Sequence, residues 1–220
     1  MKLKYKCLIL DHDDTVVKST PDIHYPSFVE AMKVLRPDME PLTLEQFVSY
    51  CFNPGFGELC RDILKFSDEE QEYQYRVWKK STGKIPDFYP GFPELITDYK
   101  KAGGLIAVVS HSEREIITRD YMLSCSLVPD MIFGWDQEEH KRKPSPYPVL
   151  EIMKGFDLKN HEILVVDDLK PGLDMARSCR VAFAGAGWSH MIPEIKEYMR
   201  QNADYYFTTV DELREFLFAE

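Results

Sequence analysis

Short apolar runs that end in acidic or hydroxyl residues constrain the fold of this chain more than any other feature. The main runs are Cys7–Leu10 before Asp11, Leu105–Val109, which leads into Ser110, and Ile163–Val166 before Asp167. Continuous apolar runs of this length are typical of strands that are buried on both faces of a sheet. Shorter runs of the same kind are Met131–Phe133, Val181–Ala184 and Tyr205–Phe207.

Helical patterns separate these runs. They predict helices over Pro93–Ala102, Ser112–Ser124, Pro171–Cys179 and Ile192–Gln201, and a closing helix after Thr209. Ser112 and Thr209 each precede a glutamate by three positions, which is the pattern of a capping box at a helix start. Strands that alternate with helices predict a parallel sheet covered on both faces, in a Rossmann-like α/β fold.

The stretch from residue 17 to residue 88 has a different pattern. Apolar residues recur there at helical spacing, for example around Phe28 and Phe47, and Ser67 opens a further helix with a capping box. Tyr89-Pro90-Gly91 marks the return to the alternating pattern. We therefore expect an α/β core made of residues 1–16 and 89–220, with residues 17–88 inserted as an all-helical cap domain.

Composition limits the partners and the compartment. The 220 residues carry a net charge of -10, from 27 basic and 37 acidic side chains, and nucleic-acid binding requires a basic face. The five cysteines are scattered, so neither a disulfide framework nor a zinc site is expected. The apolar run near the N-terminus is too short for a signal peptide or a membrane span. These features predict a cytoplasmic protein without nucleic-acid or membrane partners.

The polar residues that follow the predicted strands form a candidate site. Ligands of open parallel sheets bind beyond the carboxyl ends of the strands, so these residues should meet there. Crowded carboxylates repel one another unless a hard cation binds them, and an all-oxygen donor set favours magnesium. A serine hydroxyl and a loop lysine could bind phosphoryl oxygens, which together indicates phosphoryl transfer. The candidate residues are Asp11, Asp13, Ser110, Lys143, Asp167 and Asp168.

On these motifs the chain resembles the haloacid dehalogenase-like hydrolase superfamily, in its phosphoglycolate phosphatase-like branch with a helical cap after the first motif. The resemblance covers the whole core, whereas the cap resembles the family only in length and helicity. The matching motifs are Asp11-His12-Asp13-Asp14-Thr15, Val108-Val109-Ser110, Lys143-Pro144-Ser145-Pro146, and Asp167-Asp168 followed by Gly172.

The resemblance implies a magnesium-dependent phosphatase that acts on a small phosphorylated metabolite. Asp11 would attack phosphorus and form an aspartyl-phosphate. Asp13 would protonate the leaving oxygen and then deprotonate water. Ser110, the His111 amide and Lys143 would bind the transferring phosphoryl group.

The resemblance also implies a magnesium site and a role for the cap. Mg²⁺ would be held by the Asp11 carboxylate, the Asp13 backbone carbonyl and Asp168, with Asp167 as a further ligand or next to one. Cap residues would select the substrate, and Asn53 and Arg61 are candidates for that role.

Two residues depart from the family pattern. His12 stands where relatives usually carry an apolar residue, so it is either a satisfied buried histidine or a contact to the site. Asp14 stands where relatives usually carry glycine, which leaves open a tighter or differently bonded turn after Asp11.

Several alternatives remain open on the sequence. A sugar phosphomutase of the same superfamily would carry the same core motifs. A phospho-receiver domain uses similar residues but needs no long helical insert, and a non-catalytic binding protein could also retain the motifs. A dehalogenase is disfavoured because it does not need Asp13. A calcium loop is disfavoured because Val16 and Asp22 replace the required glycine and glutamate.

Overall fold

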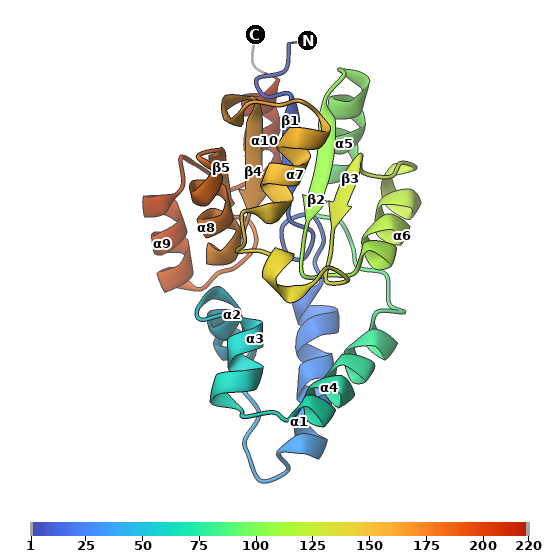
Figure 1. The fold of residues 1–220 in the computed structure, drawn as a ribbon, viewed down its shortest axis with the longest axis vertical. Helices are drawn as coiled ribbons and strands as arrows, with labels where there is room; N and C mark the ends of the chain where they lie inside the picture. The colour runs from blue at the N-terminus through green and yellow to red at the C-terminus, as the bar shows by residue number, and fades with distance from the viewer. Residues whose placement is uncertain (1, 219–220) are drawn as a thin grey trace. The chain divides into compact units, whose positions relative to one another are not determined.

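The chain folds into two compact units in a computed structural model that describes residues 2–218 (Figure 1). One unit consists of the residues up to Val17 together with those from Phe88 onward, and the other is Lys18–Asp87. The predicted role of the second unit as a cap stays a prediction.

A parallel sheet forms the centre of the first unit. Its strand order is β3-β2-β1-β4-β5-β6, and every neighbouring pair is parallel. The order departs from β1 in both directions, so the topological switch point lies between β1 and β4. The predicted Rossmann-like α/β fold is therefore confirmed. The strands are β1 (Cys7–Leu10), β2 (Leu105–Val109), β3 (Met131–Phe133), β4 (Ile163–Asp167), β5 (Ala182–Ala186) and β6 (Tyr205–Phe207).

Helices cover both faces of the sheet, which explains why the strands are apolar throughout. Leu8 and Leu10 of β1 belong to a core with Leu95 and Leu213, whereas the side chain of Ile9 points to the opposite face and is also fully buried. In Figure 1, α7 and α8 lie in front of the sheet and α5 lies behind it. The helices of this unit are α5 (Phe92–Lys101), α6 (Arg114–Cys125), α7 (Tyr147–Gly155), α8 (Lys170–Cys179), α9 (Pro193–Asn202) and α10 (Val210–Leu217).

The helix starts differ from the sequence expectations in two places. α7 was not predicted, and it carries a proline in its first turn, where proline is well accommodated. The capping box predicted at Ser112 is wrong: the N-cap is Glu113, one residue later, and α6 begins at Arg114 with no side-chain cap. The box at Thr209 is present.

The second unit is helical wherever its described residues are regular. A π-helical turn, Thr20–His24, leads into α1 (Tyr25–Leu35). Its core contains Phe28 and Phe47, whose ring centroids lie 5.0 Å apart, and the predicted capping box at Ser67 is present. The remaining helices are α2 (Leu44–Phe52), α3 (Phe56–Glu58), the π-helical turn Leu59–Ile63, and α4 (Asp68–Ser81).

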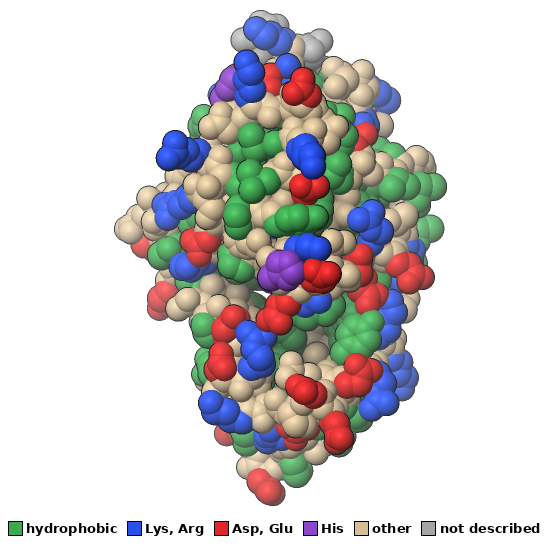
Figure 2. Space-filling model, in the orientation of Figure 1, with side chains coloured by type: hydrophobic (Ala, Val, Ile, Leu, Met, Phe, Trp, Pro, Cys, Tyr) green, Lys and Arg blue, Asp and Glu red, His purple; other side chains and the backbone are tan. Residues whose placement is uncertain are grey.

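The surface of the chain is mixed in charge. On the face shown in Figure 2, acidic and basic side chains of the described residues are interspersed. Within residues 2–218, no helix combines the length and the apolar character that crossing a membrane requires.

Candidate active site

The candidate site lies at the carboxyl ends of β1, β2 and β4. Asp11 follows β1 directly, and its amide donates to the Val166 carbonyl of β4 at 2.9 Å. Asp167 is the last residue of β4, and Ser110 directly follows β2. Strand pairing therefore brings together motifs that are far apart in the sequence, at the switch point where ligands of such folds bind.

The turn after Asp11 is held by backbone hydrogen bonds. The amides of Val16 and Val17 both donate to the His12 carbonyl at 3.0 Å, and the Asp14 amide donates to the Val17 carbonyl at 2.7 Å. Asp14 has a φ of 57°, in the left-handed region that glycine adopts freely and aspartate tolerates. The departure at Asp14 is thus a local substitution in a turn whose shape suits glycine.

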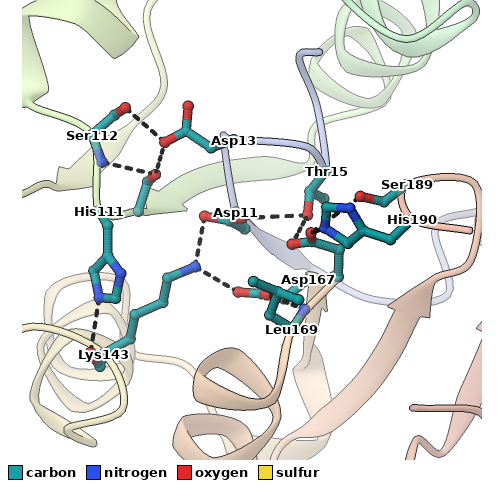
Figure 3. A network of polar contacts seen from close by, with 12 residues as sticks. Asp11, Asp13, Thr15, His111, Ser112, Lys143, Asp167, Leu169, Ser189 and His190 are labelled. Carbon is teal, nitrogen blue, oxygen red and sulfur yellow. Dashed lines mark hydrogen bonds and ion pairs between the residues drawn. The ribbon is translucent and has the colours of Figure 1, made fainter. Parts of the chain in front are cut away.

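Lys143 is the central cation of the site (Figure 3). Its Nζ lies 2.7 Å from Asp11 Oδ1 and 2.8 Å from Asp167 Oδ2, and the residue is only 8% exposed. Burial alone would lower the pKa of the ammonium group, but the two carboxylates beside it raise that pKa overall. The lysine is therefore firmly protonated where a transferring phosphoryl group would need a positive charge.

The two carboxylates that Lys143 contacts are themselves perturbed. Burial raises the pKa of Asp11 well above its ordinary value, although Lys143 opposes the shift. Burial also raises the pKa of Asp167 to about 6, with Asp168 adding to the rise and Lys143 opposing it. The positive charge of Lys143 therefore does not offset the combined effect of burial and of the neighbouring carboxylates on these two pKa values.

Gly172 lets Asp167 occupy its position. The Asp167 carboxylate accepts from Lys143 through Oδ2 and from the Leu169 amide through Oδ1, at 2.8 and 2.9 Å. A Cβ atom on Gly172 would lie 2.1 Å from Asp167 Oδ2. The glycine of the fourth motif is therefore required by the close approach of this side chain.

Asp168 is surrounded by donors that the sequence did not indicate. Thr15 Oγ1 donates to its Oδ1 at 3.1 Å, while Ser189 Oγ donates to Oδ2 at 3.1 Å and His190 Nε2 lies 2.5 Å from Oδ2. Burial would raise the pKa of Asp168, but His190 beside it lowers that pKa overall. Ser189 and His190 lie in the loop after β5, where no sequence pattern marked them.

Carboxylate oxygens gather closely enough to hold a cation. One oxygen each from Asp11, Asp167 and Asp168 lies within 4.8 Å of the others, and all three residues are buried. A second group, Asp14, Asp168 and His190, meets the same limit. The first group offers only oxygen donors and excess negative charge, so its chemistry suits a hard divalent cation such as Mg²⁺.

Asp13 points its carboxylate toward the end of β2, where two serines contact it. Ser112 Oγ donates to Asp13 Oδ2 at 2.6 Å, and Ser110 Oγ donates to the same oxygen at 3.2 Å. The predicted phosphate-binding Ser110 is thus placed beside the predicted acid–base residue. Ser112 was not predicted as a site residue, because its sequence context suggested a helix cap.

His111 contacts the loop that carries Lys143 through its side chain. Its Nε2 lies 3.0 Å from the Lys143 carbonyl oxygen, which can only accept, so Nε2 is the donor. Burial and the charge of Lys143 lower the pKa of His111 to about 4. A neutral imidazole therefore links the loop that carries Lys143 to the end of β2.

His12 is buried away from solvent and paired with α6. Its Nε2 lies 3.2 Å from Asp120 Oδ2, and the two residues are 1% and 0% exposed. Arg119 contacts the other oxygen of Asp120 at 2.7 Å. Two roles were considered for His12, a buried histidine with a partner and a contact to the site. The contact found joins it to Asp120, a buried partner on α6.

Comparisons with known proteins identify the family of the chain. Residues 8–186 match the family model of haloacid dehalogenase-like hydrolases. The chain is 26% identical over 215 residues to a protein of Caldanaerobacter subterraneus subsp. tengcongensis that is provisionally named as the pyrophosphatase PpaX, covering 93% of this chain and 90% of that protein. It is also 26% identical over 195 residues to the phosphoglycolate phosphatase of Aquifex aeolicus, covering 84% and 86% of the two chains.

Solved structures show the same fold. CbbY from Rhodobacter sphaeroides, crystallised with phosphate, superposes with a TM-score of 0.74 at 17% identity, covering 95% of this chain and 96% of that one. The family match spans most of the chain, so this protein belongs to the haloacid dehalogenase-like hydrolase family, as its motifs indicated.

Proposed function

We propose that this protein is a magnesium-dependent phosphatase that hydrolyses a small phosphorylated metabolite through an aspartyl-phosphate on Asp11. One observation carries the proposal: Lys143 contacts the Asp11 carboxylate at 2.7 Å inside a cluster of buried acids. The contact supports the proposal because the nucleophile, the phosphoryl-binding cation and the metal donor set that we propose all lie around one point.

The chain's own residues divide the reaction between them. An Asp11 carboxylate oxygen attacks phosphorus while the bond to the leaving oxygen breaks, and Asp13 gives that oxygen its proton. Asp13 then takes a proton from water, whose oxygen attacks phosphorus and releases Asp11. Ser110, the His111 amide and Lys143 hold the phosphoryl oxygens during both steps.

The metal ligands we propose are Asp11, the Asp13 backbone carbonyl and Asp168, with Asp167 adjoining them. A bound Mg²⁺ would neutralise the crowded carboxylates and polarise a phosphoryl oxygen. Burial is the main cause of the raised pKa values of Asp11 and Asp167. These raised values support the assignment, because a divalent cation would stabilise the charged forms of both residues.

The names of two relatives and the charge of the chain support the proposed substrate class. Two relatives are named as a phosphoglycolate phosphatase and, provisionally, a pyrophosphatase, and both names denote hydrolysis at phosphorus. The net charge of -10 repels an anionic substrate on average, so local positive groups such as Lys143 must bind it. A small phosphate ester fits that requirement.

The experiment is an assay of aryl phosphate hydrolysis by the purified protein, followed by a screen of phosphorylated metabolites. We expect activity with Mg²⁺, none with EDTA, and none in Asp11→Asn. Asp38→Asn, an exposed aspartate outside the site, is the matched control and should retain full activity. Full activity of Asp11→Asn, or of the wild type in EDTA, would exclude the mechanism.

We further propose that Lys18–Asp87 serves as the cap that selects the substrate. Substitution of Asn53 or Arg61 should change kcat/KM for the metabolite found in the screen. Turnover of acetyl phosphate should survive both substitutions, because the chemistry belongs to residues of the α/β unit. Equal losses for both substrates would contradict a role in selection.

A further inference from the structure

Ser112 stands out among the buried polar side chains that the proposed function does not use. It is 1% exposed, and its hydroxyl lies 2.6 Å from Asp13 Oδ2. The hydroxyl of Ser110 reaches the same oxygen at the longer distance of 3.2 Å. Figure 3 shows the Ser112 contact on one carboxylate oxygen of Asp13, with the other oxygen directed away from it.

The backbone of Ser112 is fixed on both sides. Its amide donates to Ser110 Oγ at 3.1 Å, and its carbonyl accepts from the Trp135 amide at 2.8 Å. Gly134 packs against the same carbonyl so closely that a Cβ atom there would lie 2.6 Å from it. The hydroxyl of Ser112 is therefore presented to Asp13 from a rigid support, as precise positioning requires.

Ser110 and Ser112 cannot both donate a hydrogen bond to Asp13 throughout turnover. In the proposed function Ser110 donates its hydroxyl hydrogen to a phosphoryl oxygen, and a hydroxyl has only one hydrogen to donate. When substrate binds, Ser110 must therefore release Asp13, and Ser112 remains as the donor of this pair.

We propose that Ser112 is the positioning residue for Asp13, holding its carboxyl group in place while Ser110 turns to the phosphoryl group. This inference rests on the proposed function. Asp13 Oδ2 accepts from Ser112 whether the carboxyl group is charged or neutral, so the transferred proton is carried by Oδ1. That proton passes from Oδ1 to the leaving oxygen as the bond to phosphorus breaks, and Oδ1 regains a proton from the attacking water.

The test compares two substrates that differ in their need for a proton. Phenyl phosphate releases a basic phenolate, whereas 2,4-dinitrophenyl phosphate releases an anion that leaves without protonation. The ratio kcat/KM reports the steps through cleavage of the leaving group, so it isolates the acid role of Asp13. We expect Ser112→Ala to lower kcat/KM for phenyl phosphate by about 10- to 100-fold, a partial loss of general-acid catalysis.

The second substrate supplies the internal control. For 2,4-dinitrophenyl phosphate, kcat/KM of Ser112→Ala should stay within about threefold of wild type, because no proton is needed. The same variant should show a burst of dinitrophenolate, since hydrolysis of the aspartyl-phosphate still needs Asp13 as a base. Ser112→Thr, which keeps the hydroxyl, should restore the wild-type ratio between the substrates.

The outcomes separate this inference from the proposed function. Equal losses for both substrates in Ser112→Ala would overturn the positioning role while leaving the phosphatase intact. If that variant does not fold, Ser112→Cys keeps the size with a weaker donor, and an unchanged substrate ratio there would also overturn the inference. Failure of the wild type to turn over either substrate would overturn the proposed function and this inference with it.

Discussion

Replacing the buried Lys143 by methionine should strongly destabilise the fold. The substitution keeps most of the side-chain volume and removes the cation that lies 2.7 Å from Asp11 and 2.8 Å from Asp167. Both carboxylates are buried, at 4% and 1% exposure, so water cannot replace the lost ammonium group. The variant therefore leaves two buried acids without their common partner.

The size of the effect follows from the distances. At these separations and an effective dielectric constant of about 20, each contact contributes roughly 6 kcal/mol of gross attraction. Desolvation of the three charges offsets much of this, and removing one partner of a buried pair costs about 3–5 kcal/mol. Since domains are stable by about 5–15 kcal/mol, Lys143→Met should be marginally folded.

The pH dependence of this loss has a definite sign. The pKa of Asp167 is about 6 even with Lys143 present, and burial is the main cause. Without the lysine that pKa rises further, so the folded state takes up a proton as the pH falls. The cost of Lys143→Met should therefore be smaller at pH 5.5 than at pH 7.5.

The assay is urea unfolding followed by circular dichroism, in EDTA so that no divalent cation substitutes for the lysine. Lys141→Met is the matched control, because Lys141 lies in the same loop and pairs with the exposed Glu138 at 3.0 Å. Surface pairs of that kind contribute little, so the control should unfold close to wild type. Adding Asp167→Asn to Lys143→Met should recover part of the loss. Equal unfolding midpoints for the two lysine variants would refute the reasoning.

Three further predictions concern single positions. Gly172→Ala should lower stability by about 1–3 kcal/mol in urea unfolding, because its methyl group must displace Asp167, whereas Gly83→Ala meets no atom closer than 3.6 Å and should be tolerated. The depressed pKa of His111, about 4, means that the unfolded chain binds a proton first as the pH falls from 6.5. The unfolding free energy of the wild type should therefore decrease as the pH falls from 6.5 to 4. This decrease should be steeper than that of His111→Asn by up to about 1.4 kcal/mol per pH unit. Asp14→Gly should raise the unfolding free energy by about 0.5–1 kcal/mol, because glycine adopts the left-handed φ of 57° freely, and a loss of stability would contradict this.

The sheet was predictable because burial on both faces leaves a direct mark on the sequence. Each predicted strand is present, with β4 extended to Ile163–Asp167 and β5 shifted to Ala182–Ala186. The placement of Asp11, Ser110 and Asp167 together follows from that sheet, since each stands at a strand end beside the switch point. In this part of the site, hydrophobic periodicity and topology were sufficient.

Contacts made by side chains from irregular loops were not predictable. His190 and Ser189 reach Asp168 from the loop after β5, and no periodicity or spacing relates them to the fourth motif. The pairing of His12 with Asp120 likewise joins a turn to a helix more than a hundred positions away along the chain. Such contacts depend on loop conformation and helix rotation, which local patterns do not specify.

Ser112 shows how a correct local pattern can be overridden by tertiary structure. Its sequence context favours a capping box, and a side-chain cap contributes about 1 kcal/mol to a helix. A hydrogen bond to a charged group contributes about 1.5–3 kcal/mol, and the Asp13 carboxylate lies within 2.6 Å of the hydroxyl. A cap would require the hydroxyl oxygen to accept from an amide of the first helical turn. Here the Ser112 side chain is directed to Asp13, and α6 begins after Glu113 without a side-chain cap. A helix start without its predicted side-chain cap, next to Asp13, the acid–base residue that we propose, is expected where a functional site and not the helix determines the placement of a side chain.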